Sequence, residues 1–225
     1  ARAYTHTAEY DMAIAAYMRR EAGLSEKLFL SFERTQELRY GENPHQRAAF
    51  YREADEVPYS LASARQLHGK ELSYNNIQDA NAALELLREF DDPCCVAVKH
   101  MNPCGTALGA DAADAWRRAY EADPVSIFGG IVALNRPLTR EAAAAMKPVF
   151  LEIVIAPAFE PEALELLAAK KNLRLLEVDM TRSDVHPMQY VSVNGGLLAQ
   201  ELDVETKRVE ASMTVTTVSY THLTL

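Results

Sequence analysis

The string VKHMNPCG (residues 98–105) places a lysine beside a histidine directly after a short apolar run. Neighbouring strand residues face opposite sides, so Lys99 and His100 can share a pocket only where the strand ends. We expect Pro103 and Gly105 to turn the chain there. An imidazole accepts protons near neutral pH, and an adjacent ammonium disfavours a second positive charge. The pair fits a proton acceptor beside a cation; the alternative, which these two residues alone favour, is a surface lysine with a loop-capping histidine.

A second string that could do chemistry is LRYGENPHQ (residues 38–46). Arg39 offers a planar fork for carboxamide or phosphate oxygens, and Tyr40 offers an amphipathic wall. Gly41 allows a backbone to approach a ligand closely. A polar surface turn is the alternative, but the variety of residue types in this string favours a functional interpretation.

The third string, DPVSIFGG (residues 123–130), leads into an apolar run. Gly129 and the glycine after it permit positive φ and an exposed backbone amide, and Phe128 could lie against a flat heterocycle. As a bare pattern this is weak, because two glycines before a strand often form only a turn.

The elements that would position these residues alternate between helical and strand patterns, which indicates an α/β fold with a layered mixed sheet and flanking helices. The polar, β-branched end of the chain, residues 203–225, is expected to be a linker. A short element is also expected at residues 25–32. Helices are expected at 7–21 with Thr7 as N-cap, 77–90, 111–121, 139–146 and 161–170, and strands at 94–98, 131–134, 153–156, 173–178 and 189–193.

Composition restricts the class of protein. The 225 residues are 48% hydrophobic and 24% charged, as expected for one globular domain or slightly more. A net charge of -9 argues against nucleic acid as a partner. No apolar run is long enough to span a membrane and the chain does not open with a signal-peptide pattern, so a cytoplasmic protein is expected. Three cysteines in one apolar stretch favour reduced thiols over disulfides.

Five strings in this order, LRYGENPHQ, HGKELSYNNI, VKHMNPCG, DPVSIFGG and IAPAF, resemble the transformylase domain of the AICAR transformylase/IMP cyclohydrolase family of bifunctional purine biosynthesis proteins. The resemblance extends to about residue 217. It implies that residues 1–23 end a cyclohydrolase domain and that residues 24–202 form a first transformylase subdomain with a cytidine-deaminase-like fold. Residues 203–225 would then link to a second, missing subdomain, with a non-native tail at 218–225.

The resemblance also implies an activity. The family transfers a formyl group from 10-formyltetrahydrofolate to the 5-amino group of AICAR and then closes the ring to IMP, working as a homodimer. The family's residues for the folate, the nucleotide phosphate and a potassium ion lie largely in the missing half. This chain is therefore expected to be incomplete for both activities.

Site residues follow from the same resemblance. The family's catalytic lysine and histidine fall on Lys99 and His100. His100 would take the amine proton, and Lys99 would stabilise the oxyanion on the formyl oxygen. The family's substrate-binding positions fall on Arg39, Tyr40, Asn76, Phe128, Gly129 and Glu152.

Two rival interpretations belong to other classes of protein. A zinc-dependent deaminase carries H-x-E followed by P-C-x-x-C. Here Pro103 and Cys104 are present, but Ala107 stands at the second cysteine position and Asn102 at the acidic position, so we expect no zinc and no other metal. The second rival is a non-catalytic fragment that binds a nucleotide or dimerises.

Overall fold

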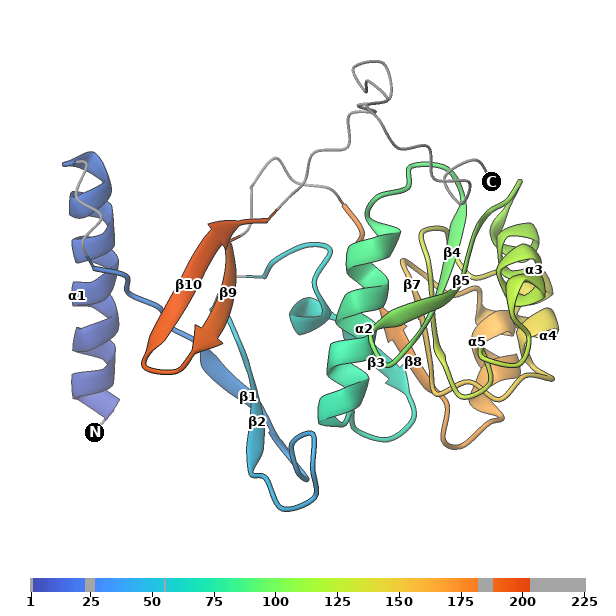
Figure 1. The fold of residues 1–225 in the computed structure, drawn as a ribbon, viewed down its shortest axis with the longest axis horizontal. Coiled ribbons are helices and arrows are strands. Elements are labelled where there is room, and N and C mark those ends of the chain that lie inside the picture. Colours follow the sequence, from blue (N-terminus) through green and yellow to red (C-terminus); the bar gives the residue numbers. More distant parts are fainter. Residues whose placement is uncertain (1, 23–26, 55, 182–187, 203–225) are drawn as a thin grey trace, which may run out of the picture. The chain divides into compact units, whose positions relative to one another are not determined.

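Helices and strands alternate along the chain (Figure 1). The computed structural model describes residues 2–22, 27–54, 56–181 and 188–202. Two units are described separately, residues 1–182 and residues 183–225. The elements of the first are α1 (Arg2–Glu21), β1 (Glu33–Leu38), β2 (Ala48–Arg52), a 3-10 turn (Leu61–Ser63), β3 (Arg65–His68), α2 (Tyr74–Leu87), β4 (Cys94–Lys99), β5 (Asn102–Leu108), α3 (Ala112–Ala122), β6 (Ile131–Leu134), α4 (Arg140–Met146), β7 (Ile153–Ala156), α5 (Pro161–Ala168) and β8 (Arg174–Glu177); those of the second are β9 (Met188–Val193) and β10 (Gly196–Glu201).

A six-stranded sheet forms the centre of the first unit, in the order β3-β8-β7-β6-β4-β5. β6, β7 and β8 are parallel to one another, whereas β4 runs antiparallel to both of its neighbours and β3 antiparallel to β8. The expected α/β class with a mixed sheet is therefore confirmed. No helix in the described part of the chain is both long and apolar enough to cross a membrane.

Helices cover both faces of this sheet (Figure 1). Along β4, Cys95 and Ala97 pack into the core formed with α3, α4 and α5, whereas Val96 and Val98 pack into the core formed with α2. This alternation follows from the period of two along a strand. Burying each aliphatic side chain contributes about 1.5–3 kcal/mol, so the central strands hold their ends in a fixed position.

α2 begins with a capping box. The Ser73 hydroxyl accepts a hydrogen bond from the Asn76 backbone N–H at 3.2 Å, and the Asn76 side-chain oxygen accepts one from the Ser73 N–H at 3.2 Å. The helix therefore starts three residues before the predicted residue 77 and ends at Leu87, three residues before the predicted residue 90. The cap was missed because asparagine replaces the usual glutamate at its third position.

Three other predictions are wrong. α1 begins at Arg2, and Thr7 lies within it, where its hydroxyl donates to the Ala3 carbonyl at 3.0 Å instead of capping the helix. Pro103 and Gly105 lie within β5 and do not turn the chain. The described residues of the element expected at 25–32 form neither helix nor strand, and the predicted linker and tail at 203–225 lie outside the described residues.

The predicted strands 131–134 and 153–156 coincide with β6 and β7. Thr139 caps α4 by accepting from the Ala142 N–H at 3.2 Å, and the other predicted helices and strands agree with the structure within a few residues. β1, β2, β3, β5 and β10 were not predicted. β10 pairs with β9 across Asn194 and Gly195, where Gly195 has a φ of 76°.

Candidate active site

The ends of the central strands meet at one edge of the sheet. The strand pairing aligns Val98 of β4 with Ile131 of β6, Ile131 with Ile153 of β7, and Ile153 with Arg174 of β8. Because β4 runs antiparallel to β6, the last residue of β4 lies at the edge where β6, β7 and β8 begin. Residues just before these three strands are therefore neighbours of the end of β4, although they are far apart in the sequence.

Lys99 is the last residue of β4, and its side chain lies at this edge. Its ammonium group donates a hydrogen bond to the Phe128 carbonyl at 2.9 Å. An ammonium has three N–H donors, and no second partner for this one is found in the described part of the chain. The residue Phe128 is 59% exposed, and its ring packs against the Phe150 ring with centroids 5.2 Å apart. A fixed cation therefore lies beside an exposed aromatic surface.

Two glycines shape the loop that carries Phe128. Gly129 has a φ of 75°, which favours glycine, and its N–H donates to the Phe150 carbonyl at 2.7 Å. A Cβ atom on Gly130 would lie 3.0 Å from the Ile127 carbonyl oxygen and 3.2 Å from that of Val98. Sterics therefore explain the pair of glycines, because a side chain at Gly130 would crowd the Val98 carbonyl of β4 and keep the loop from packing against this strand.

His100 follows Lys99 in a tight turn. His100 and Met101 have φ values of 54° and 59°, and they join β4 to β5 between the paired residues Lys99 and Asn102. Two left-handed residues in a hairpin correspond to a type I′ turn, in which asparagine and glycine are preferred. The Asn102 side chain donates to the His100 carbonyl at 2.7 Å, and the Met101 N–H donates to the Asp79 carboxylate at 2.7 Å. The break that the sequence pattern assigned to Pro103 is therefore made by His100 itself.

Across the edge, Asn76 holds Glu152. The Asn76 side-chain NH₂ donates to Glu152 Oε2 at 2.8 Å, and Asn76 is only 5% exposed. Because its oxygen accepts from Ser73, both polar ends of this amide are used within the protein. The Glu152 side chain is 43% exposed, and its Oε1 has no partner among the residues that the structure describes. Asn76 therefore orients Glu152, and its contact with a nucleotide stays a prediction.

Arg174, at the start of β8, is a further residue of this edge that the sequence patterns did not indicate. Its Nε donates to the carbonyls of Lys70 and Glu71 at 3.1 and 3.2 Å, and its Nη1 lies 4.0 Å from Glu152 Oε2. These bonds attach the segment before α2 to the sheet. The available signal was an arginine at the start of a predicted apolar strand, which is too common a pattern to indicate a site.

The structure does not bring all of the predicted residues together. Lys99, His100, Phe128, Gly129, Asn76 and Glu152 belong to the sheet edge. Arg39 and Tyr40 follow β1, with the guanidinium 5.9 Å from the tyrosine ring centroid. No hydrogen bond or ion pair in the described residues joins these two to the sheet edge. β1 is attached nearby through Gln36, whose side chain donates to the Leu72 carbonyl at 3.0 Å.

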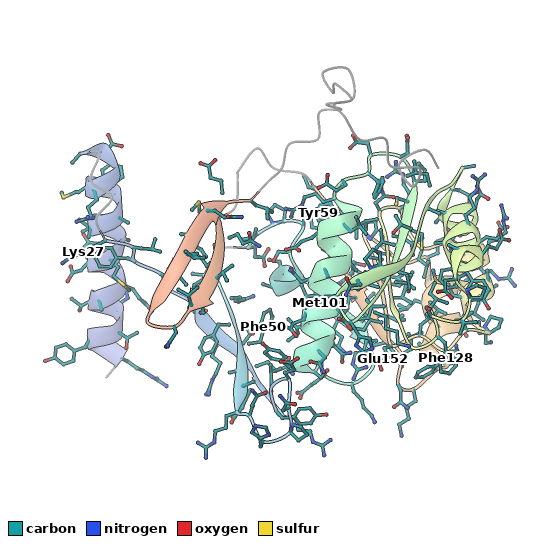
Figure 2. The ribbon with its side chains drawn as sticks, in the orientation of Figure 1. Lys27, Phe50, Tyr59, Met101, Phe128 and Glu152 are labelled. Carbon is teal, nitrogen blue, oxygen red and sulfur yellow. The ribbon has the colours of Figure 1, made fainter. Side chains whose placement is uncertain are left out.

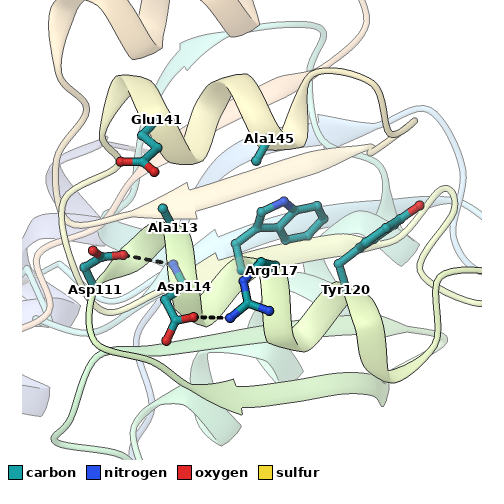
Figure 3. Close-up of a pocket in the computed structure, with 8 residues that line it drawn as sticks. Asp111, Ala113, Asp114, Arg117, Tyr120, Glu141 and Ala145 are labelled. Carbon is teal, nitrogen blue, oxygen red and sulfur yellow. Dashed lines mark hydrogen bonds and ion pairs between the residues drawn. The ribbon is translucent and has the colours of Figure 1, made fainter.

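A hollow of about 370 Å³ lies elsewhere, between α3 and α4 (Figure 3). Three of the charged residues around it are engaged in hydrogen bonds or ion pairs, namely Asp111, Asp114 and Arg117. Asp111 caps α3 by accepting from the Asp114 N–H at 2.9 Å. The Ala110 backbone N–H and the Arg117 guanidinium lower the pKa of Asp114 to about 2. None of the predicted site residues lines this hollow, so it is not the candidate site.

The cysteines do not provide a nucleophile. Burial raises the pKa of Cys94 to about 11, and burial also raises the pKa of Cys104, so both thiols are protonated at neutral pH. Among the described residues, no group of three or more His, Cys, Asp or Glu side chains is arranged to hold a metal ion.

Figure 2 labels Met101, Phe128 and Glu152, which come from three different loops. These are the β4–β5 turn, the loop before β6 and the loop before β7. Chemically, the sheet edge combines a fixed ammonium, an exposed imidazole, an aromatic face and a carboxylate with an unused oxygen. It can hold a flat polar ligand, accept a proton from it and stabilise a developing negative charge.

Comparisons with known proteins show which family this chain resembles. The bifunctional purine biosynthesis protein PurH of Enterococcus faecalis is 56% identical over 218 residues, which cover 96% of this chain and 42% of that protein. PurH of Oceanobacillus iheyensis is 53% identical over 207 residues, which cover 91% of this chain and 41% of that protein. The chain thus spans about two fifths of the length of these relatives.

Among solved structures, Acinetobacter baumannii RibD matches with a TM-score of 0.31 and 15% identity, covering 37% of this chain and 28% of that one. A similarity this low supports no inference about the function of this chain. The match to the family of the AICARFT/IMPCHase bienzyme, in contrast, extends over residues 1–224. With nearly its whole length matched, the chain belongs to the AICARFT/IMPCHase bienzyme family.

Proposed function

We propose that this chain is the part of a bifunctional purine biosynthesis enzyme that contributes Lys99 and His100 to formyl transfer from 10-formyltetrahydrofolate to the 5-amino group of AICAR. Family membership supports the reaction. In this proposal residues 1–23 end the cyclohydrolase domain, residues 24–202 form the first transformylase subdomain, and residues 203–225 lead to the second. Ring closure to IMP and a cytoplasmic homodimer belong to the longer enzyme.

The reaction needs both a base and a cation. The amino group of AICAR is a poor nucleophile, because its lone pair is delocalised toward the carboxamide. As this nitrogen bonds to the formyl carbon, His100 takes its proton, and the Lys99 ammonium stabilises the negative charge that develops on the formyl oxygen. The bond from the formyl carbon to the folate nitrogen then breaks, and that nitrogen takes up a proton as tetrahydrofolate leaves.

One observation carries the proposal: the Lys99 ammonium is held by the Phe128 carbonyl at 2.9 Å, and His100 follows it in a constrained turn. A cation that is positioned in advance needs no reorganisation as charge develops. The exposed Phe128 ring offers a surface for the flat imidazole of AICAR. The unused oxygen of Glu152 can accept a hydrogen bond from the nucleotide.

The change His100→Ala in the full-length enzyme carrying this sequence tests the proposal. We expect kcat to fall on the order of 100-fold or more, with little change in the KM for AICAR, because a general base acts in the transition state. Arg39→Ala is the matched variant and should mainly raise KM, because a fork that grips the substrate serves the ground and transition states alike. Steady-state formyl transfer measures both constants, and a near-normal kcat for His100→Ala would show that His100 is not the proton acceptor.

A second function is favoured by the fact that the chain covers only 42% of its Enterococcus faecalis relative. By itself, the chain would bind the nucleotide without transferring a formyl group. Calorimetry of the isolated chain with AICAR, together with a formyl-transfer assay of the same preparation, separates the two. Turnover by the isolated chain would exclude the binding fragment.

A further inference from the structure

Asp79 connects α2 to the turn that carries His100. Its Oδ1 accepts a hydrogen bond from the Met101 backbone N–H at 2.7 Å. Asp79 lies three residues after Asn76, and this spacing puts both side chains on the same face of the helix. Since Asn76 holds Glu152 at 2.8 Å, one face of α2 binds two of the loops that build the sheet edge. Figure 2 labels Met101 and Glu152, the residues that these two bonds reach.

The turn needs to be held from outside. His100 and Met101 both adopt positive φ without being glycine or asparagine, a conformation that persists only where the surroundings enforce it. Burial does not enforce it, because the Met101 side chain is 53% exposed. Asn102 holds the His100 carbonyl from within the hairpin, whereas Asp79 holds the Met101 N–H from another element.

The helix that carries Asp79 is a rigid support. Ala80, Ala83 and Leu84 are buried against the sheet, with exposed fractions of 3% or less. The carboxylate is a charged acceptor, and charge-assisted hydrogen bonds are roughly twice as strong as neutral ones. A carboxylate on this helix is therefore well placed to fix the backbone of a strained turn.

We infer that Asp79 is a positioning residue for His100, because its carboxylate fixes the left-handed turn and thereby the direction of the imidazole relative to Lys99. This inference rests on the proposed function of His100. Asp79 acts through the backbone of the turn and not on the substrate. Its loss should therefore lower kcat while leaving nucleotide binding nearly unchanged.

Two substitutions in the full-length enzyme separate the hydrogen bond from the charge. Asp79→Ala removes the acceptor, whereas Asp79→Asn keeps a side-chain oxygen in the same place. We expect Asp79→Ala to lower kcat about 10-fold, the order expected for one hydrogen bond to a charged group, with KM for AICAR nearly unchanged. Asp79→Asn should recover part of this loss, because its neutral oxygen still accepts a hydrogen bond, which is about half as strong as the charge-assisted one. Glu85→Ala, on the same helix, is the control and should retain the wild-type kcat.

Backbone readouts test the turn directly. The Met101 amide hydrogen should exchange with solvent faster in Asp79→Ala than in Asp79→Asn, as measured by hydrogen exchange. Glycine adopts positive φ readily, so the double variant Asp79→Ala with Met101→Gly should have a kcat several-fold higher than that of Asp79→Ala alone. A merely structural role of Asp79 would not predict this recovery.

The outcomes separate this inference from the proposed function. If Asp79→Ala keeps the wild-type kcat while His100→Ala loses it, the inference fails and the function stands. Equal losses in Asp79→Ala and Asp79→Asn, with unchanged Met101 exchange, would mean that the carboxylate acts on the ligand, and so would also overturn it. Absence of any recovery with Met101→Gly would contradict it too. A wild-type kcat in His100→Ala would overturn both.

Discussion

Two charged regions of the molecule use their charges differently. On α3, Arg117 contacts both Asp114 at 2.5 Å and Glu121 at 3.1 Å, so that opposite charges neutralise one another. At the sheet edge, the Lys99 ammonium is held by a neutral backbone carbonyl, whereas Glu152 accepts from the neutral Asn76 amide and also lies 4.0 Å from the Arg174 guanidinium. Because a neutral dipole does not cancel the charge that it holds, the positive charge of Lys99 stays available for a ligand. The comparison indicates why the sheet edge, and not the hollow beside α3, is the candidate site.

Arg117 and Glu121 on α3 are largely exposed, with side-chain exposed fractions of 55% and 60%. Exposed ion pairs such as those on α3 are screened by water and salt and contribute little to stability. Lys99 is only partly exposed, and the Asn76 partner of Glu152 is buried. A charge at a partly buried position is screened less by solvent and salt than a fully exposed one.

The largest expected effect comes from removing one positive charge in each region. Lys99→Ala in the full-length enzyme should lower kcat for formyl transfer on the order of 100-fold, the typical loss for one oxyanion donor. Arg117→Ala removes the same charge from α3 and should leave kcat unchanged. Steady-state kinetics of both variants measure kcat. Equal losses would show that net charge matters, and not the position of the cation.

A smaller effect is expected at the carboxylate of the sheet edge. Glu152→Gln keeps the shape and an oxygen that can bind Asn76, but it weakens the acceptor offered to the nucleotide. We expect the KM for AICAR to rise about 10-fold, on the order of one charge-assisted hydrogen bond, with a smaller change in kcat. Glu89→Gln, on the exposed surface, is the control. An unchanged KM would mean that Glu152 does not bind the nucleotide, and that its bond to Asn76 serves only to hold the loop before β7.

The smallest effect concerns the acid stability contributed by α3. The pKa of Asp114 is lowered from 3.8 to about 2, chiefly by the Ala110 backbone N–H and then by Arg117. A depressed folded-state pKa stabilises the fold above the unfolded pKa, and this contribution is lost as pH falls from about 4 to about 2. Urea midpoints of the wild type and Asp114→Asn should therefore differ at pH 5 and converge near pH 2. A constant difference across this range would contradict the assignment.

The sequence predicted best the elements with purely local signals. β6 and β7 are short apolar runs between turn residues, and they were located to the residue because strands buried on both faces read as continuous apolar segments. β3 was missed because it is a half-exposed outer strand of the sheet and pairs with β8, which lies more than 100 residues later in the sequence. β10 was missed although Asn194 and Gly195 carry a typical hairpin signal.

For the site, the sequence by itself determined which chemical groups are present: a lysine beside a histidine, and a phenylalanine followed by glycines. Tertiary structure decided how they are held. The turn was expected at Pro103 and Gly105, but it forms at His100 and Met101, where Asp79 binds a backbone N–H 22 residues away. The bond between Asn76 and Glu152 spans 76 residues. Such contacts depend on strand register and on the packing of α2 against the sheet, which local residue preferences do not encode.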